Sequence, residues 1–141
     1  MKKEVCVITG GGSGMGLAAA KYMPKEKIIL VTGRTLAKLE RAVTELQEAG
    51  YEAYAKTCDT SVRSQVQELA AYAAELGEIK NVIHAAGLSP AMADPEKLLR
   101  VNALGTVYIN QEFSKYMKAG SVIVDISSNS AYMIPGFLAK K

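Results

Sequence analysis

Short apolar runs alternate with longer amphipathic segments along most of this chain. Residues 27–32 and 121–126 are largely apolar at consecutive positions, which is typical of strands that a parallel sheet buries on both faces. Residues 36–49 and 62–76 instead place leucine, valine or alanine every three or four positions, the spacing of an α-helix with one buried face. The pattern therefore predicts a sheet whose strands are joined by helices.

Turn and capping residues indicate where these elements end. Pro24, Gly50 and Gly120 each follow a predicted helix, as expected for residues that terminate helices. Asp94 and Pro95 supply an N-cap and a first-turn proline for the last helix. The strands are expected at residues 4–9, 27–32, 51–57, 81–85 and 121–126, and the helices at 14–23, 36–49, 62–76 and 94–117. Right-handed crossovers between such units form a doubly wound parallel sheet, so we expect one α/β, Rossmann-like domain of about five strands.

Composition and charge exclude several classes of partner. The 141 residues carry a formal net charge of +3 and are 49% hydrophobic, which suits one globular domain. Lysines and arginines are scattered along the predicted helices, so we expect no nucleic-acid partner. No apolar run reaches the roughly 20 residues that span a bilayer, and the first strand leads into glycines, so we expect no membrane partner and a cytoplasmic location. Cys6 and Cys58 lack metal-ligand spacing, and we expect two buried thiols and no metal site.

A glycine-rich segment joins the first predicted strand to the first predicted helix, and it reads Thr-Gly-Gly-Gly-Ser-Gly-Met-Gly over residues 9–16. Glycines permit a sharp turn and let the backbone approach a pyrophosphate closely, beside the amide groups of a helix N-terminus. The alternative is a glycine-rich loop that binds nothing. The candidate cofactor-binding residues of this segment are Gly10, Gly12, Ser13, Gly14, Met15 and Gly16.

The spacing Thr-Gly-x-x-x-Gly-x-Gly differs from the Gly-x-Gly-x-x-Gly fingerprint and resembles the short-chain dehydrogenase/reductase family. The resemblance covers essentially the whole chain. It implies a nicotinamide dinucleotide cofactor and transfer of a hydride between the nicotinamide and a carbonyl or secondary alcohol of a small-molecule substrate. It also implies a homo-oligomer for the full-length protein.

Arg34 follows the second strand, at the position that faces the adenosine ribose in a dinucleotide-binding fold. An acidic side chain there would bond the ribose 2′-hydroxyl and select NAD(H), whereas arginine accommodates a 2′-phosphate. Its planar guanidinium can hold a phosphate through two parallel hydrogen bonds. We therefore predict a preference for NADP(H), with NAD(H) as the second choice. The alternative is an exposed arginine that merely begins the next helix.

Two residues after the third strand are candidates for the adenine pocket. By the family resemblance, Asp59 bonds the adenine amino group and its neighbour Thr60 lines the pocket. In the alternative interpretation, Asp59 or Ser61 simply caps the following helix.

The fourth strand ends in His-Ala-Ala-Gly, where the family commonly has Asn-Asn-Ala-Gly. Ala86 and Gly87 match this pattern, which implies a close approach of the backbone to the nicotinamide ribose. His84 departs from it. Because His84 lacks any metal-partner spacing, we expect a buried, hydrogen-bonded histidine rather than a catalytic one.

Asn102 and Ser128 are the candidate catalytic residues. Asn102 lies in a segment similar to the family's asparagine motif, which implies a local disturbance of helix hydrogen bonding and a water held in a proton relay. Its alternative role is that of a helix polar residue bonded to a backbone carbonyl. Ser128, just beyond the last strand, is implied to bond the substrate oxygen, with Ser127 as the second choice and an ordinary turn serine as the alternative.

The family's catalytic Tyr-x-x-x-Lys is not found in these residues, because Tyr132 is followed four positions later by Gly136. The usual spacing from the serine would place the tyrosine at about the position of Lys141. We therefore expect a domain that is incomplete at its C-terminus and a 141-residue chain that is inactive alone. A non-catalytic dinucleotide binder or redox sensor is the second hypothesis. A methyltransferase is the third, and Arg34 opposes it because that cofactor would favour an acidic residue there.

Overall fold

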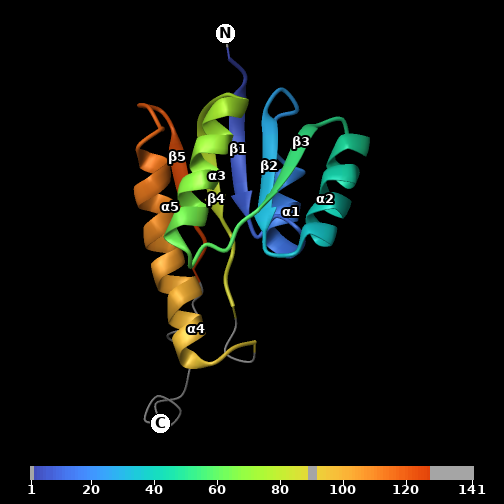
Figure 1. The fold of residues 1–141 in the computed structure, drawn as a ribbon. Helices are drawn as coiled ribbons and strands as arrows, with labels where there is room; N and C mark the ends of the chain where they lie inside the picture. Colours follow the sequence, from blue (N-terminus) through green and yellow to red (C-terminus); the bar gives the residue numbers. More distant parts are fainter. Residues whose placement is uncertain (1, 89–91, 128–141) are drawn as a thin grey trace.

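The computed structural model describes residues 2–88 and 92–127. Its centre is one sheet of five parallel strands in the order β3-β2-β1-β4-β5 (Figure 1). The strands are β1 (Glu4–Thr9), β2 (Ile28–Gly33), β3 (Glu52–Thr57), β4 (Glu78–His84) and β5 (Val122–Asp125). The predicted doubly wound α/β fold is therefore confirmed.

Helices cover both faces of the sheet. Figure 1 shows α3 and α5 on one face and α1 and α2 on the other. The helices are α1 (Gly14–Ala20), α2 (Leu36–Glu48), α3 (Arg63–Leu76), α4 (Pro95–Leu99) and α5 (Gly105–Ser114), and the π-helical turn η1 (Arg100–Leu104) joins α4 to α5.

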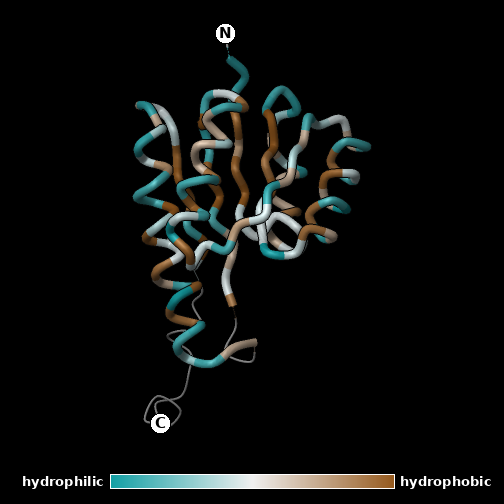
Figure 2. The backbone as a smooth tube through the Cα atoms, viewed as in Figure 1, coloured by the Kyte–Doolittle hydropathy of each residue, from teal (hydrophilic) through white to brown (hydrophobic). Residues whose placement is uncertain are grey.

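The two apolar layers arise from the alternation of side chains along the central strands. In β1, Val5 and Val7 pack against α3 and α5, whereas Cys6 and Ile8 face α1 and α2. Phe113 of α5 is fully buried in the first of these layers. Figure 2 shows the result as hydrophobic strands between helices whose outer faces are hydrophilic.

Three elements differ from the prediction by more than one residue at an end or in continuity. The first helix ends at Ala20 instead of residue 23, and the fourth strand begins at Glu78 instead of residue 81. The Glu78 amide donates to the carbonyl of Lys3 at 2.9 Å, which extends the pairing of β4 with the start of β1. The single helix expected over 94–117 is divided by η1 and ends at Ser114.

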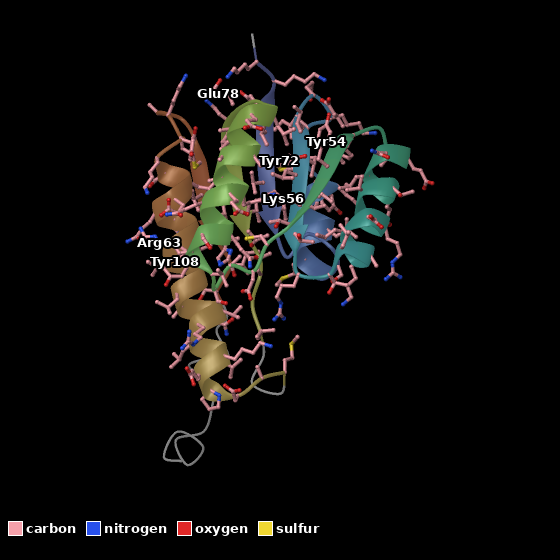
Figure 3. The ribbon with its side chains drawn as sticks, in the orientation of Figure 1. Tyr54, Lys56, Arg63, Tyr72, Glu78 and Tyr108 are labelled. Carbon is pink, nitrogen blue, oxygen red and sulfur yellow. The ribbon has the colours of Figure 1, made fainter. Side chains whose placement is uncertain are left out.

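Polar contacts fasten α3 to its neighbours at the surface (Figure 3). The Arg63 guanidinium lies 5.7 Å from the centre of the Tyr108 ring and pairs with the buried Glu112 carboxylate at 3.0 Å. The Lys56 ammonium lies 5.3 Å from the centre of the Tyr72 ring. The contacts of Arg63 thus join α3 to α5, and the contact of Lys56 with Tyr72 joins β3 to α3.

Both cysteines are free and buried, as predicted. Burial raises the pKa of the Cys6 thiol to about 12 and that of the Cys58 thiol to about 12. Because the thiolate is the reactive form, neither thiol should react with a disulfide reagent at pH 8 in the folded protein. We expect two thiols per chain to react only after unfolding in guanidinium chloride. Rapid labelling of one thiol before unfolding would contradict this burial.

Within residues 2–88 and 92–127, no helix combines the length and apolar character needed to cross a bilayer. In the same residues, no group of three or more histidine, cysteine, aspartate or glutamate side chains is arranged to hold a metal ion.

Candidate functional site

A cavity of about 300 Å³ lies at the carboxyl ends of β1, β2 and β4. Because β1 lies between β2 and β4, the strand order reverses at this place, and open α/β sheets bind ligands at such reversal points. Most of the predicted cofactor-binding residues line the cavity, namely Gly10, Ser13, Gly14, Met15, Gly16, Arg34, Asp59, Thr60, Ala86 and Gly87. Gly12 and Asn102 do not line it, and a Cβ atom at Gly12 would instead lie 3.3 Å from the Cβ of Lys38.

A larger hollow of about 960 Å³ opens at the opposite end of the sheet, and one of the residues that line it is Glu78, which Figure 3 labels at that end. Its walls carry charges of both signs, and Lys27 there pairs with Glu4 at 3.0 Å. No predicted site residue lines it, and it lies at the amino ends of the strands. The smaller cavity is therefore the candidate site.

The glycine loop has its shape because side chains cannot be accommodated at three of its positions, Gly10, Gly11 and Gly16. Gly10 has a φ of +66°, and a Cβ atom on it would lie 2.9 Å from the backbone nitrogen of Ala86. A Cβ atom on Gly16 would collide with the carbonyl oxygen of Gly10. The first turn of α1 can therefore pack directly against the end of β1, and the loop borders the cavity.

Gly14 is constrained by its backbone conformation and not by its neighbours. Its φ is +58°, but no atom of the described residues lies within 4 Å of an added Cβ. The left-handed conformation favours glycine there, since other residues occupy it at a cost of about 1–2 kcal/mol. The space around Gly14 is open, and Gly14 lines the cavity.

Arg34 and Thr32 form the wall at the end of β2. The Arg34 side chain is exposed at the rim and has no hydrogen-bond or ion-pair partner among the described residues. The Thr32 hydroxyl is fully buried and is likewise without a hydrogen-bond partner in that part of the chain. Buried polar groups are normally satisfied, so an orphaned hydroxyl beside a cavity indicates a place for a ligand or an ordered water. Sequence reasoning missed Thr32, because an apolar strand gives no signal that one hydroxyl faces a cavity.

Asp59 is held in the turn that precedes α3. Its carboxylate accepts hydrogen bonds from the Ser61 amide at 3.0 Å and from the Ser61 hydroxyl at 2.6 Å. Although partial burial raises the pKa of Asp59, these bonds and the positive charges of Arg34 and Lys97 lower it overall. The residue preceding α3 is Val62, and no side chain caps that helix. The alternative interpretation of Asp59 or Ser61 as the helix cap is therefore wrong.

His84 is a satisfied, buried histidine, as predicted, and is 2% exposed. Its Nδ1 lies 2.7 Å from the Thr9 hydroxyl oxygen, and its Nε2 lies 3.1 Å from the Thr106 hydroxyl oxygen. Burial lowers the pKa of the imidazole, and the negative charge of Asp125 opposes this shift only in part. His84 is therefore neutral at physiological pH.

Asn102 lies in η1, where the helix hydrogen bonding is disturbed as the family resemblance implied. Its side-chain oxygen accepts from the Leu88 amide at 2.9 Å, and its side-chain nitrogen donates to the Leu88 carbonyl at 2.9 Å. Its backbone carbonyl accepts the Thr106 hydroxyl at 2.8 Å. The side chain thus anchors the segment after β4. Its bond to the Leu88 carbonyl fits the alternative role, that of a helix polar residue bonded to a backbone carbonyl. The identity of the partner was not predicted, because Leu88 lies outside the helix and far from Asn102 in the sequence.

The structure describes one of the two candidate serines. Ser127 is exposed just after β5, and Ser128 lies outside the described residues. Nearby, the Asn110 side-chain amide donates to both carboxylate oxygens of Asp125, at 3.1 and 3.0 Å. This contact fixes the end of β5 against α5.

Comparison with known proteins gives a family match over nearly the whole chain. The sequence profile of the family described as short chain dehydrogenase matches residues 4–139. A short-chain dehydrogenase/reductase of Alternaria brassicicola, bsc3, is 31% identical over 134 residues, which are 95% of this chain and 48% of that protein. Carbonyl reductase family member 4 of Xenopus laevis is 30% identical over 136 residues, which are 89% of this chain and 56% of that protein. The chain spans about half the length of the curated relatives it matches.

Solved structures of full-length enzymes share the fold. An actinorhodin polyketide ketoreductase crystallised with NADPH matches with a TM-score of 0.79 and 28% identity, over 92% of this chain and 55% of that one. An NAD+-bound xylitol dehydrogenase matches with a TM-score of 0.82 and 25% identity, over 94% of this chain and 55% of that one. With the glycine loop at the reversal point of the sheet and a family match from residue 4 to residue 139, this chain belongs to the short-chain dehydrogenase/reductase family.

Proposed function

We propose that this chain is the cofactor-binding part of an NADP(H)-dependent oxidoreductase that acts on a carbonyl or secondary alcohol. The observation that carries the proposal is the cavity itself, where the glycine loop, the partner-free Arg34 and the orphaned Thr32 hydroxyl meet. When bound, the nicotinamide cofactor supplies the hydride chemistry. The protein binds the cofactor, orients the substrate beside it and polarises the substrate oxygen. We further propose a homo-oligomeric, cytoplasmic protein with a small-molecule substrate.

The residues present fit such a cofactor. A narrow loop without side chains at Gly10, Gly14 and Gly16 leaves its backbone open to a pyrophosphate. The Thr32 hydroxyl supplies one unused hydrogen-bonding group at the cavity wall. The proposed partner of the adenine is Asp59, with Thr60 beside it, and Ala86 and Gly87 would border the nicotinamide ribose, as in the family resembled.

Arg34 supports the preference for NADP(H) over NAD(H). Its guanidinium is exposed at the rim and, although its charge acts on Asp59, it forms no ion pair with a carboxylate of the described residues, so it is available for a 2′-phosphate. The solved relatives do not decide between the two cofactors, because one carries NADPH and another carries NAD+.

Ser128 and Asn102 are the proposed contributors to the chemical step. Ser128 would donate a hydrogen bond to the substrate oxygen, an interaction that strengthens as negative charge develops there. Asn102 would support a proton relay from η1, whose position its bonds to Leu88 fix. The general acid would be a tyrosine assisted by a lysine.

A non-catalytic dinucleotide binder or redox sensor is the second candidate function. Absence of Tyr-x-x-x-Lys from the native gene product would favour it, and the motif does not occur among these 141 residues. It predicts the same cofactor binding but no turnover by any product of the gene.

An assay of NADPH oxidation with a panel of ketones and aldehydes separates these two functions. We expect the 141-residue chain to bind NADPH without oxidising it, because the proposed general acid is not among its residues. A gene product with an intact mass well above 15.1 kDa that contains the tyrosine and lysine is expected to oxidise NADPH. Robust turnover by the short chain would show that the acid has been misassigned, and inactivity of the longer protein on the whole panel would favour the non-catalytic binder.

A further inference from the structure

His84 is the one histidine of the chain, and the proposed chemistry does not use it. Its ring lies at the end of β4 between two threonine hydroxyls, those of Thr9 in β1 and Thr106 in α5. Two residues after it, Ala86 borders the cavity. The ring therefore joins three elements at the edge of the candidate site.

The hydrogen bonds of the neighbours determine which nitrogen of His84 carries the proton. The Thr106 hydroxyl donates its single proton to the Asn102 carbonyl at 2.8 Å, so towards His84 it can only accept. Nε2 must then be the protonated nitrogen, and in a neutral ring Nδ1 is the acceptor.

Thr9 is consistent with this direction. Its hydroxyl oxygen accepts the Ala86 amide at 3.1 Å and remains free to donate its proton to Nδ1 of His84 at 2.7 Å. The opposite tautomer would require Thr106 to donate to the ring, and the bond from Thr106 to the Asn102 carbonyl would be lost. One tautomer therefore satisfies every partner, and the other leaves the Asn102 carbonyl without this hydrogen bond.

The hydrogen bonds form a closed circuit around the wall of the cavity. They run from the Ala86 amide through Thr9, His84 and Thr106 to the Asn102 carbonyl. The Asn102 side chain then returns to both backbone groups of Leu88, two residues after Ala86. Ala86 and Leu88 both line the cavity, so both ends of the circuit hold the same wall.

We propose that His84, as the neutral Nε2–H tautomer, is a positioning residue that fixes the Ala86–Leu88 wall of the cofactor cavity to η1. This inference rests on the proposed function, because it assigns the cavity to NADP(H). His84 acts through Thr9 and Thr106 and touches no cofactor itself. Acidification should reverse the bond between Thr9 and His84, since a protonated ring donates from both nitrogens. The Thr9 hydroxyl then accepts from Nδ1 as well as from the Ala86 amide, and its own proton loses this acceptor.

The charges around the ring set the pH range in which His84 becomes protonated. Asp125, at the end of β5, is the charged group that acts on the ring among the described residues, and it favours the protonated form. Burial outweighs it, so the pKa of His84 lies below its usual value of 6.5. The Thr9 hydroxyl should therefore donate to Nδ1 at pH 7.5, and this bond should reverse only in acid.

The first test needs no cofactor. Because the chain has one histidine, nitrogen NMR of the imidazole reports His84 without ambiguity. We expect an Nε2-protonated, Nδ1-unprotonated ring at pH 7.5 that titrates below pH 6.5. We also expect the opposite tautomer to become populated in Thr106→Val, where the accepting hydroxyl is absent. A ring protonated on Nδ1 in the wild-type chain would overturn the proposal.

The second test is the affinity for NADPH at pH 7.5. Thr106→Val removes the bonds to the Asn102 carbonyl and to His84, and it should weaken the affinity by about threefold to tenfold, the usual effect of losing the bond to His84. Thr106→Ser should restore the affinity. Thr44→Val is the matched control. The Thr44 hydroxyl of α2 also donates to the carbonyl four residues earlier, that of Glu40, at 3.0 Å, but it does not contact His84. We expect the control to bind like the wild-type chain.

The two tests separate failure of this inference from failure of the proposed function. A wild-type chain that binds no NADPH would contradict the proposed function, while the tautomer would still show whether the circuit exists. If the wild-type chain binds NADPH and Thr106→Val binds it as tightly as Thr44→Val, the positioning role of His84 is wrong.

Discussion

Replacement of Gly10 with alanine is expected to lower the free energy of unfolding by about 2–4 kcal/mol, because two costs combine. The φ of +66° is strained for any residue with a Cβ atom. In addition, the new methyl group would lie 2.9 Å from the Ala86 nitrogen and 3.0 Å from the Ala85 carbonyl oxygen, which are backbone atoms of the neighbouring strand end. Urea denaturation followed by circular dichroism measures the loss.

Gly50→Ala is the matched control for this substitution. Gly50 also has a positive φ, +97°, but an added Cβ there meets only the flexible Lys25 side chain at 3.6 Å. It should therefore show the backbone strain alone, about 1–2 kcal/mol. Equal losses in the two variants would show that the close approach of Gly10 to the end of β4 has no energetic importance.

Arg34→Asp is expected to weaken NADPH binding by about ten- to a hundredfold and to make NADH the preferred cofactor. The loss corresponds to a charge-assisted hydrogen bond of about 1.5–3 kcal/mol to the 2′-phosphate. The gain arises because an aspartate at this position can accept the ribose 2′-hydroxyl of NADH. Fluorescence titration with both cofactors gives the two dissociation constants.

Arg41→Asp makes the same charge change on α2 and is the control for long-range electrostatics. Arg41 is exposed and does not line the cavity, and within residues 2–88 and 92–127 its side chain makes one hydrogen bond, to the Ala37 carbonyl at 3.4 Å. We expect it to retain the wild-type preference for NADPH. Equal affinities of the wild-type chain for NADPH and NADH would contradict the role of Arg34.

Hydrophobic patterning was sufficient to predict five strands, because a short apolar or alternating run marks each of them. It was wrong about the burial of the last strand, since Val122 and Val124 of β5 are exposed. It failed where pairing partners are distant. The first residues of β4, Glu78 and Ile79, alternate polar and apolar after Gly77, and only the bond of Glu78 to Lys3 extends the strand to them. Within residues 94–117, the Asn102 motif implied a local disturbance of the helix, but not that a π-helical turn would separate α4 from α5.

The candidate site was predictable to the extent that backbone conformation is encoded by glycine. Gly10, Gly14 and Gly16 could be placed at the cavity, because spaced glycines between a buried strand and a helix indicate a sharp turn whose backbone is open to a ligand. The unpartnered Thr32 hydroxyl and the Thr106 bond to His84 could not be, since their importance lies in which atoms meet across the sheet. The catalytic role of Ser128 remains a prediction outside the described residues.

Calorimetric titration of NADPH into the wild-type chain, Gly14→Ala and Gly50→Ala tests the location of the cofactor most directly. Both glycines have a positive φ, but of the two only Gly14 lines the cavity. A methyl group added at Gly14 would occupy the open space of the cavity or shift the glycine loop. The account predicts saturable, one-to-one binding by the wild-type chain and by Gly50→Ala, and an affinity at least about tenfold lower in Gly14→Ala, a loss of about 1.4 kcal/mol. Absence of binding by the folded wild-type chain, or equal binding by Gly14→Ala, would contradict the assignment of this cavity to the cofactor.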